Sequence, residues 1–171
     1  MQIKTKDCMN DKEYSLFNNT IKNHWLSINE DDSKNKNIQK ASTYIKTNHI
    51  NIDSLRNKLN KNREPFEKGF QNGINLKRNK LIIFLECILL ISLIILIISS
   101  HASLVKTSNI ISIIILVINT INLIINIHQF HKNRQNYMTK SEYIKYSKFR
   151  NLINDVYSFQ KTQEILTNMK K

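Results

Sequence analysis

The chain has 171 residues, with only two glycines, one proline and two cysteines, and 26 Lys and Arg against 13 Asp and Glu. So few glycines exclude the glycine-rich loops that bind nucleotide phosphates, and Cys8 and Cys87 are too few for a disulfide framework or a CxxC metal site. The shortage of glycine and proline favours long helices over a sheet with many turns. We therefore expect an all-α protein.

Residues 1–80 are expected to form a cytoplasmic helical region. Within residues 11–30, large apolar side chains recur every three or four positions, which is typical of an amphipathic helix; they are Tyr14, Phe17, Ile21, Trp25 and Ile28. The polar run at 30–37 predicts a break before a second helix.

The second helix is indicated by Ile38, Ala41 and Ile45. Asp53 and Ser54 could cap a third helix, which we expect to be interrupted at Pro65. Gly69 and Gly73 favour a hinge at the membrane entrance over a seam between two copies.

Residues 81–127 contain two apolar runs, 81–100 and 110–127, separated by a loop at 101–109. As helices they would span about 30 and 27 Å, close to the thickness of a bilayer's hydrocarbon core. A loop this short makes the helices antiparallel neighbours. The sequence therefore predicts a two-helix transmembrane hairpin with amphipathic helices before and after it and coiled-coil packing among its helices.

The basic residues predict the orientation of this hairpin. Sixteen Lys and Arg precede Leu81, only Lys106 lies in the loop, and nine follow Ile127. Because charge-poor loops face away from the cytoplasm, both termini should be cytoplasmic. The basic residues beside the spans are expected to meet anionic headgroups of the lipid bilayer; they are Lys77, Arg78, Lys80, Lys132 and Arg134. No recognisable nucleic-acid-binding module accompanies them, so nucleic acid is an unlikely partner.

Residues 128–171 should form a cytoplasmic C-terminal helix. Thr139 and Glu142 have the spacing of a capping box at its start. Its apolar face needs a cover, which could be the N-terminal helices, another subunit or the membrane surface; this face comprises Tyr146, Phe149, Ile153, Val156 and Phe159.

Polar residues inside the second apolar run are the main candidates for function. Ser112, Asn119, Asn122 and Asn126 fall within about 80° of one another at 100° per residue. Lipid cannot hydrogen-bond an amide, so this stripe should face protein or water. Three interpretations remain open: hydrogen bonds between helices, the wall of a pore, or the compositional drift of an AT-rich genome.

Glu86 lies about 7 Å below the predicted interface, where a carboxylate is costly unless it is paired, protonated or hydrated. A hairpin symmetric about its loop places Glu86 level with Asn122. We expect Glu86 to hydrogen-bond Asn122 or Asn126, either to set helix register or as part of a ring at the mouth of a cation pore.

No constellation typical of an active site, metal site or cofactor site can be assembled, so we expect neither an enzyme nor a bound cofactor. His128 and His131 share a helix face but have no third ligand nearby in the sequence. They are interpreted as interfacial residues.

Residues 65–160 resemble the SLATT family, the SMODS- and SLOG-associating two-transmembrane effectors. The likeness rests on a helix leading into a tight hairpin, then an amphipathic helix with spaced aromatic and aliphatic residues: Phe130, Tyr137, Tyr143, Tyr146, Leu152 and Ile153. This resemblance implies an oligomeric, pore-forming or membrane-perturbing effector, triggered by a separate nucleotide-sensing or signalling protein. The alternative is a non-conducting membrane anchor or scaffold whose cytoplasmic helices recruit a protein partner.

Overall fold

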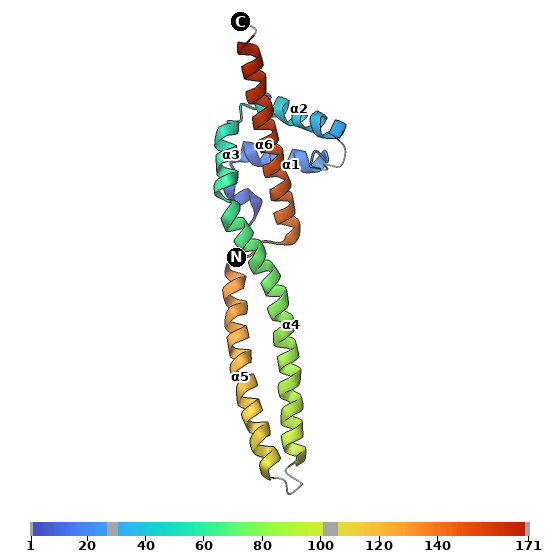
Figure 1. Cartoon of the computed structure of the whole chain (residues 1–171), viewed down its shortest axis with the longest axis vertical. Helices are drawn as coiled ribbons and strands as arrows, with labels where there is room; N and C mark the ends of the chain where they lie inside the picture. The colour runs from blue at the N-terminus through green and yellow to red at the C-terminus, as the bar shows by residue number, and fades with distance from the viewer. Residues whose placement is uncertain (1, 27–30, 101–105, 170–171) are drawn as a thin grey trace. The chain divides into compact units, whose positions relative to one another are not determined.

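The computed structural model describes residues 2–26, 31–100 and 106–169, and all the elements in these ranges are helical (Figure 1). In chain order they are η1 (Thr5–Cys8), α1 (Asp11–Lys22), α2 (Asp31–Thr47), α3 (Ile52–Lys61), α4 (Arg63–Ser100), α5 (Lys106–Gln135) and α6 (Lys140–Asn168). The chain forms two compact units. A helical bundle comprises residues 3–70 and 138–171, and a helix pair comprises residues 1–2 and 71–137.

The bundle is built around α6, which packs against α1, α2 and α3. Its inward face places Tyr146, Phe149, Ile153 and Val156 at no more than 1% exposure. These are four of the five side chains that the sequence placed on one face, and Phe159 packs partly buried against the same core. The N-terminal helices therefore cover this face, which was one of the three alternatives that the sequence left open.

Aromatic and polar contacts fix how α6 lies against its neighbours. The Phe149 ring packs edge-on against Phe17 of α1, with centroids 5.1 Å apart. The Tyr146 hydroxyl donates a hydrogen bond to the Leu59 carbonyl at the end of α3. The Arg56 guanidinium lies 4.3 Å from the centre of the Tyr157 ring. Such contacts add direction to the non-directional burial of apolar surface.

The helix starts are set by side chains that cap free backbone N–H groups. Asn10 caps α1 in a full capping box with Glu13. Asn51, rather than the expected Asp53 or Ser54, caps α3, because its Oδ1 accepts from the Ser54 N–H at 2.9 Å. Thr139 caps α6 as expected, but Glu142 completes no box, since its carboxylate accepts from the Thr5 N–H at 2.8 Å.

Two helix ends are also well defined. After α1 the chain turns at His24 (φ 54°), and after α2 it turns at His49 (φ 51°). In each case the next residue, Trp25 or Ile50, donates its N–H five residues back and buries its side chain, as in a Schellman motif. Ile28, predicted to extend the stripe of α1, lies outside the described residues.

The polar run at 30–37 is not a break throughout. Residues 31–37 form the first two turns of α2, so that part of the prediction was wrong. A true interruption does occur near Pro65: α3 ends at Lys61 and α4 begins at Arg63, which places Pro65 in the first turn, where a missing N–H costs nothing.

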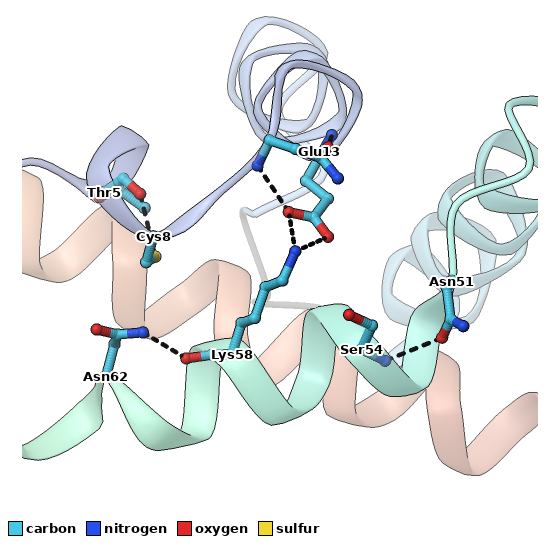
Figure 2. A network of polar contacts seen from close by, with 8 residues as sticks. Thr5, Cys8, Glu13, Asn51, Ser54, Lys58 and Asn62 are labelled. Carbon is cyan, nitrogen blue, oxygen red and sulfur yellow. Dashed lines mark hydrogen bonds and ion pairs between the residues drawn. The ribbon is translucent and has the colours of Figure 1, made fainter.

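An ion pair with a buried carboxylate joins α1 to α3 (Figure 2). The Glu13 side chain is only 4% exposed, and the Lys58 Nζ donates to its two carboxylate oxygens at 2.9 and 3.2 Å. The Asn10 N–H donates to the same carboxylate. Because all these contacts satisfy one buried charge, loss of Lys58 would leave that charge without its cation.

In the helix pair, α5 lies antiparallel beside α4 (Figure 1). The Asn72 Nδ2 donates to the Asn136 carbonyl at 2.8 Å, and Gln2 forms an isolated parallel bridge with Tyr137. The pair extends about ten residues beyond the apolar runs on both sides, further than the predicted boundaries at 80 and 128.

The two helices are long and apolar enough to cross a membrane. The most apolar 18-residue windows, within Arg63–Ser99 and Ile110–Gln135, have mean hydropathies of 3.3 and 2.5. α5 begins at Lys106, four residues earlier than predicted, and residues 101–105 of the expected loop lie outside the described residues.

α4 continues without interruption through Gly69 and Gly73. In the bundle, Gly69 accepts a hydrogen bond from the Met138 N–H at 2.8 Å, and a Cβ there would lie 2.9 Å from the Ile3 side chain. Its missing side chain therefore serves close packing within the bundle, and the hinge expected from the sequence stays a prediction.

Truncation of the α6 core is expected to destabilise the bundle. Phe149→Ala should lower the free energy of unfolding by about 3–5 kcal/mol, because it removes a fully buried ring and leaves a cavity. Denaturant unfolding of the full chain in detergent, followed by Trp25 fluorescence, measures this; Trp25 is the only tryptophan and lies in the bundle. The matched control is Ile144→Ala, which removes a side chain 41% exposed on the same helix. Equal losses in the two variants would contradict this account.

The Cys8 thiol is expected to be unreactive while the bundle is folded. Burial raises the pKa of Cys8 from 9.0 to about 11, and its Sγ donates to the Thr5 carbonyl at 3.2 Å (Figure 2). At pH 8 its thiolate fraction should be about a hundredfold lower than that of an unperturbed thiol.

The folded bundle holds this proton more tightly than the unfolded chain does. The thiol's contribution to stability is therefore complete below pH 9 and is lost as the pH rises from 9 towards 11. Mass spectrometry of iodoacetamide labelling, in a Cys87→Ser background, measures the rate against pH. Fast labelling at pH 8 without denaturant would show that Cys8 is not buried as described.

Candidate functional site

The contact face of the helix pair follows a heptad pattern. Along α4, the side chains that are not exposed include a series at alternating spacings of four and three: Asn72, Leu76, Asn79, Ile83, Glu86, Leu90, Leu93 and Ile97. From residue 110 of α5, the covered positions are Ser112, Leu116, Asn119, Leu123, Asn126, Phe130 and Asn133. This period of 3.5 residues is that of a left-handed coiled coil. We call this face the seam.

Glu86 and Asn126 meet within the seam. The Asn126 Nδ2 donates a hydrogen bond to the Glu86 Oε1 at 2.8 Å. Asn126 was one of the two partners expected from the sequence. Asn122, the other, is exposed and lies outside the seam. The structure thus brings together Glu86, Asn126, Asn119 and Ser112 along one face and leaves Asn122 on another.

Polar and apolar layers alternate along the seam. With Glu86 opposite Asn126, a step of seven residues in each antiparallel helix brings Asn79 level with Asn133 and Leu93 level with Asn119. The intervening layers contain aliphatic side chains and Phe130. Polar residues are level with each other at Glu86 and Asn126 and at Asn79 and Asn133, so a shift of one helix along the other would set them against apolar side chains.

Two polar atoms of the seam have spare hydrogen-bonding capacity. Asn79 is 2% exposed, and neither its Nδ2 nor the Glu86 Oε2 makes a hydrogen bond with a described group. A buried unsatisfied group costs about 1–3 kcal/mol. Asn79 and Glu86 are therefore the seam positions with unused hydrogen-bonding groups.

The remaining surface of the pair is apolar. Isoleucine, leucine, valine and phenylalanine side chains between Leu81 and Ile127 are 39–68% exposed where they face outward. Three outward hydroxyls make hydrogen bonds within their own helices, Ser92 to the Ile88 carbonyl, Ser99 to the Ile95 carbonyl and Thr120 to the Leu116 carbonyl. An exposed apolar surface of this extent is far larger than isolated soluble proteins carry.

Basic residues flank this apolar surface. Lys77, Arg78 and Lys80 are exposed before it, and Lys132 and Arg134 are exposed in the last turn of α5. Cations at a helix C-terminus also compensate the negative end of the helix dipole. Their places fit the expected contact with anionic headgroups, which stays a prediction.

Groups capable of acid–base or metal chemistry are sparse elsewhere. The described residues contain no cluster of three or more His, Cys, Asp or Glu side chains. One open depression between α1 and α2 is lined by residues that include Asn19, Trp25, Lys40 and Tyr44. It holds no buried charge that would orient a substrate.

Comparisons with protein-family models, characterised proteins and solved structures found no match.

Sequence reasoning missed Asn79 and Asn133 as members of the seam. Their signal was present, because Asn79 precedes Glu86 by seven residues and Asn133 follows Asn126 by seven. A stripe drawn at 100° per residue does not separate Asn122 from this series, whereas a strict seven-residue repeat does.

The register of the seam can be tested by disulfide formation in the full chain, with Cys8 and Cys87 replaced by Ser. The pair Glu86→Cys and Asn126→Cys should form an intramolecular disulfide on mild oxidation, because these side chains are already in contact. Glu86→Cys with Asn122→Cys should react much more slowly. Faster crosslinking of the second pair, measured by a gel shift, would show that the register is different.

Proposed function

We propose that this protein is a two-pass membrane anchor whose helical bundle recruits a protein partner. The observation that carries this proposal is the placement of polar groups in the helix pair. Glu86 and Asn126 use their side chains on each other, while the described outward side chains of the spans are apolar except for hydroxyls bonded within their own helices and Asn122. A pair that is polar inside and apolar outside suits a lipid environment and leaves no continuous polar wall for ions.

The orientation follows from charge and connectivity. Antiparallel helices would return the chain to the side from which it entered. Nearly all Lys and Arg lie on that side, with only Lys106 between the spans. The positive-inside rule then places both flanks of the pair, and hence the bundle, in the cytoplasm.

The bundle supplies a surface suited to protein recognition. From Lys161 to Met169 every described side chain at the end of α6 is exposed. Ile165, Leu166 and Met169 are 54%, 48% and 78% exposed. Apolar side chains on a protruding helix are the type of anchor used when one helix binds a groove or a second helix. We propose that the partner binds here.

A second candidate is the pore-forming effector implied by the SLATT resemblance. The specific observation in its favour is Asn122, an amide on the outward face of α5. In an oligomer, Asn122 could face other copies or water. The partner would then be a nucleotide-sensing or signalling protein that opens the assembly.

Leakage from liposomes discriminates between the two candidates. For an anchor, liposomes containing the purified full-length protein should retain both ions and a small dye, because Glu86 and Asn126 are occupied by each other. Variants Glu86→Gln and Asn122→Leu should be equally tight, and carbonate extraction should leave all three proteins in the membrane. Leakage by the unmodified protein that these variants abolish, without loss of insertion, would contradict the anchor and favour a pore.

A further inference from the structure

Asn122 is unusual among the outward-facing polar side chains of the helix pair. Ser92, Ser99 and Thr120 each donate to a carbonyl four residues earlier in the same helix, at 2.9, 2.9 and 2.8 Å. They therefore need no further partner. The Asn122 amide is exposed and makes no hydrogen bond with any group in the described part of the chain. In lipid, this amide would lack both a donor and an acceptor.

The residues around Asn122 form a second heptad stripe. Ile111, Ile115, Ile118, Asn122, Ile125 and Gln129 follow one another at spacings of four and three and are all exposed. None of them belongs to the seam with α4. A single Asn in the middle of an isoleucine stripe is a pattern that fixes the register and the partner number of a coiled coil, at some cost in stability.

The chemistry of the stripe favours a second copy of this chain as its partner. An amide carries both a donor and an acceptor, so two identical amides satisfy each other. Copies inserted in the same direction are related by an axis normal to the membrane, which brings every residue level with its counterpart. Asn122 would meet Asn122, and Ile118 would meet Ile118, without any change in depth.

We propose that α5 forms a parallel interface with α5 of a second copy, centred on an Asn122–Asn122 hydrogen bond. This inference rests on the proposed membrane insertion of the helix pair and adds the partner of its outer face. The seam with α4 is left intact, because the two stripes occupy different faces of α5.

Oxidative crosslinking of the full-length protein in liposomes tests this interface, in a background with Cys8 and Cys87 replaced by Ser. Ile118→Cys and Ile125→Cys should each give a disulfide-linked dimer. Val117→Cys and Ile124→Cys are matched controls, because they are also exposed and differ in depth by one residue only, but they lie on the opposite outward flank of α5. These controls should give little dimer.

Asn122→Leu should weaken dimerisation, raising the dissociation constant in detergent by about threefold to thirtyfold. Thr120→Leu, which removes a hydroxyl already bonded within its own helix, should leave the constant unchanged. Asn122→Gln should restore part of the affinity, because it keeps both hydrogen-bonding functions. These comparisons separate the loss of an amide pair from a general change in packing.

The failures are distinguishable. Release of the unmodified protein by carbonate would overturn the membrane insertion itself. Retention in the membrane with equal crosslinking at 117 and 118 would mean random collision and would overturn the dimer alone. Retention in the membrane with no crosslink at residue 118 or 125 would also overturn the pairing of two copies.

Discussion

Under the proposed membrane insertion, the central constraint on the helix pair is that lipid offers no hydrogen bonds. Apolar side chains have no preference for each other over acyl chains, so isoleucine and leucine alone do not decide how α4 and α5 lie together. The polar positions do decide it, because Glu86, Asn119 and Asn126 are cheapest when they face protein. Because these polar residues recur at heptad spacing, they lie along one continuous contact face. Register and pairing thus follow from a small number of amides and one carboxylate.

The bundle is stabilised in a different way, by the burial of apolar side chains away from water. The gain comes from removing large apolar side chains from solvent, and α6 contributes the greatest share through Tyr146, Phe149 and Ile153. The buried Glu13 carboxylate inside it is paired with the Lys58 ammonium. One chain therefore contains a bundle with an apolar interior and a helix pair with an apolar outer surface, and each is suited to a different solvent.

Several elements could be predicted from the sequence because a strong local signal specified them. The two apolar runs, the Thr139 cap and the apolar face of α6 belong to this group. The seam was predicted only in part: Asn126 was one of the two partners expected for Glu86, whereas Asn122 lies outside the seam, because it follows Asn119 by three residues and the seam continues at four and seven. The helical state of residues 31–37 was missed for another reason. Asp and Asn residues are neutral or unfavourable within helices by propensity, and in α2 the packing that begins at Ile38 outweighs this.

The place of α6 in the chain has a consequence for biosynthesis. The Tyr146 hydroxyl bonds the Leu59 carbonyl 87 residues earlier, and Glu142 bonds the Thr5 N–H 137 residues earlier. During translation, α1, α2 and α3 leave the ribosome first but lack the helix that completes their core. Both apolar helices are synthesised before that helix appears. The N-terminal helices therefore have Leu16, Phe17 and Leu55 without their final cover until α6 has been synthesised. Under the proposed membrane insertion, the bundle would complete its core only after both spans have been made.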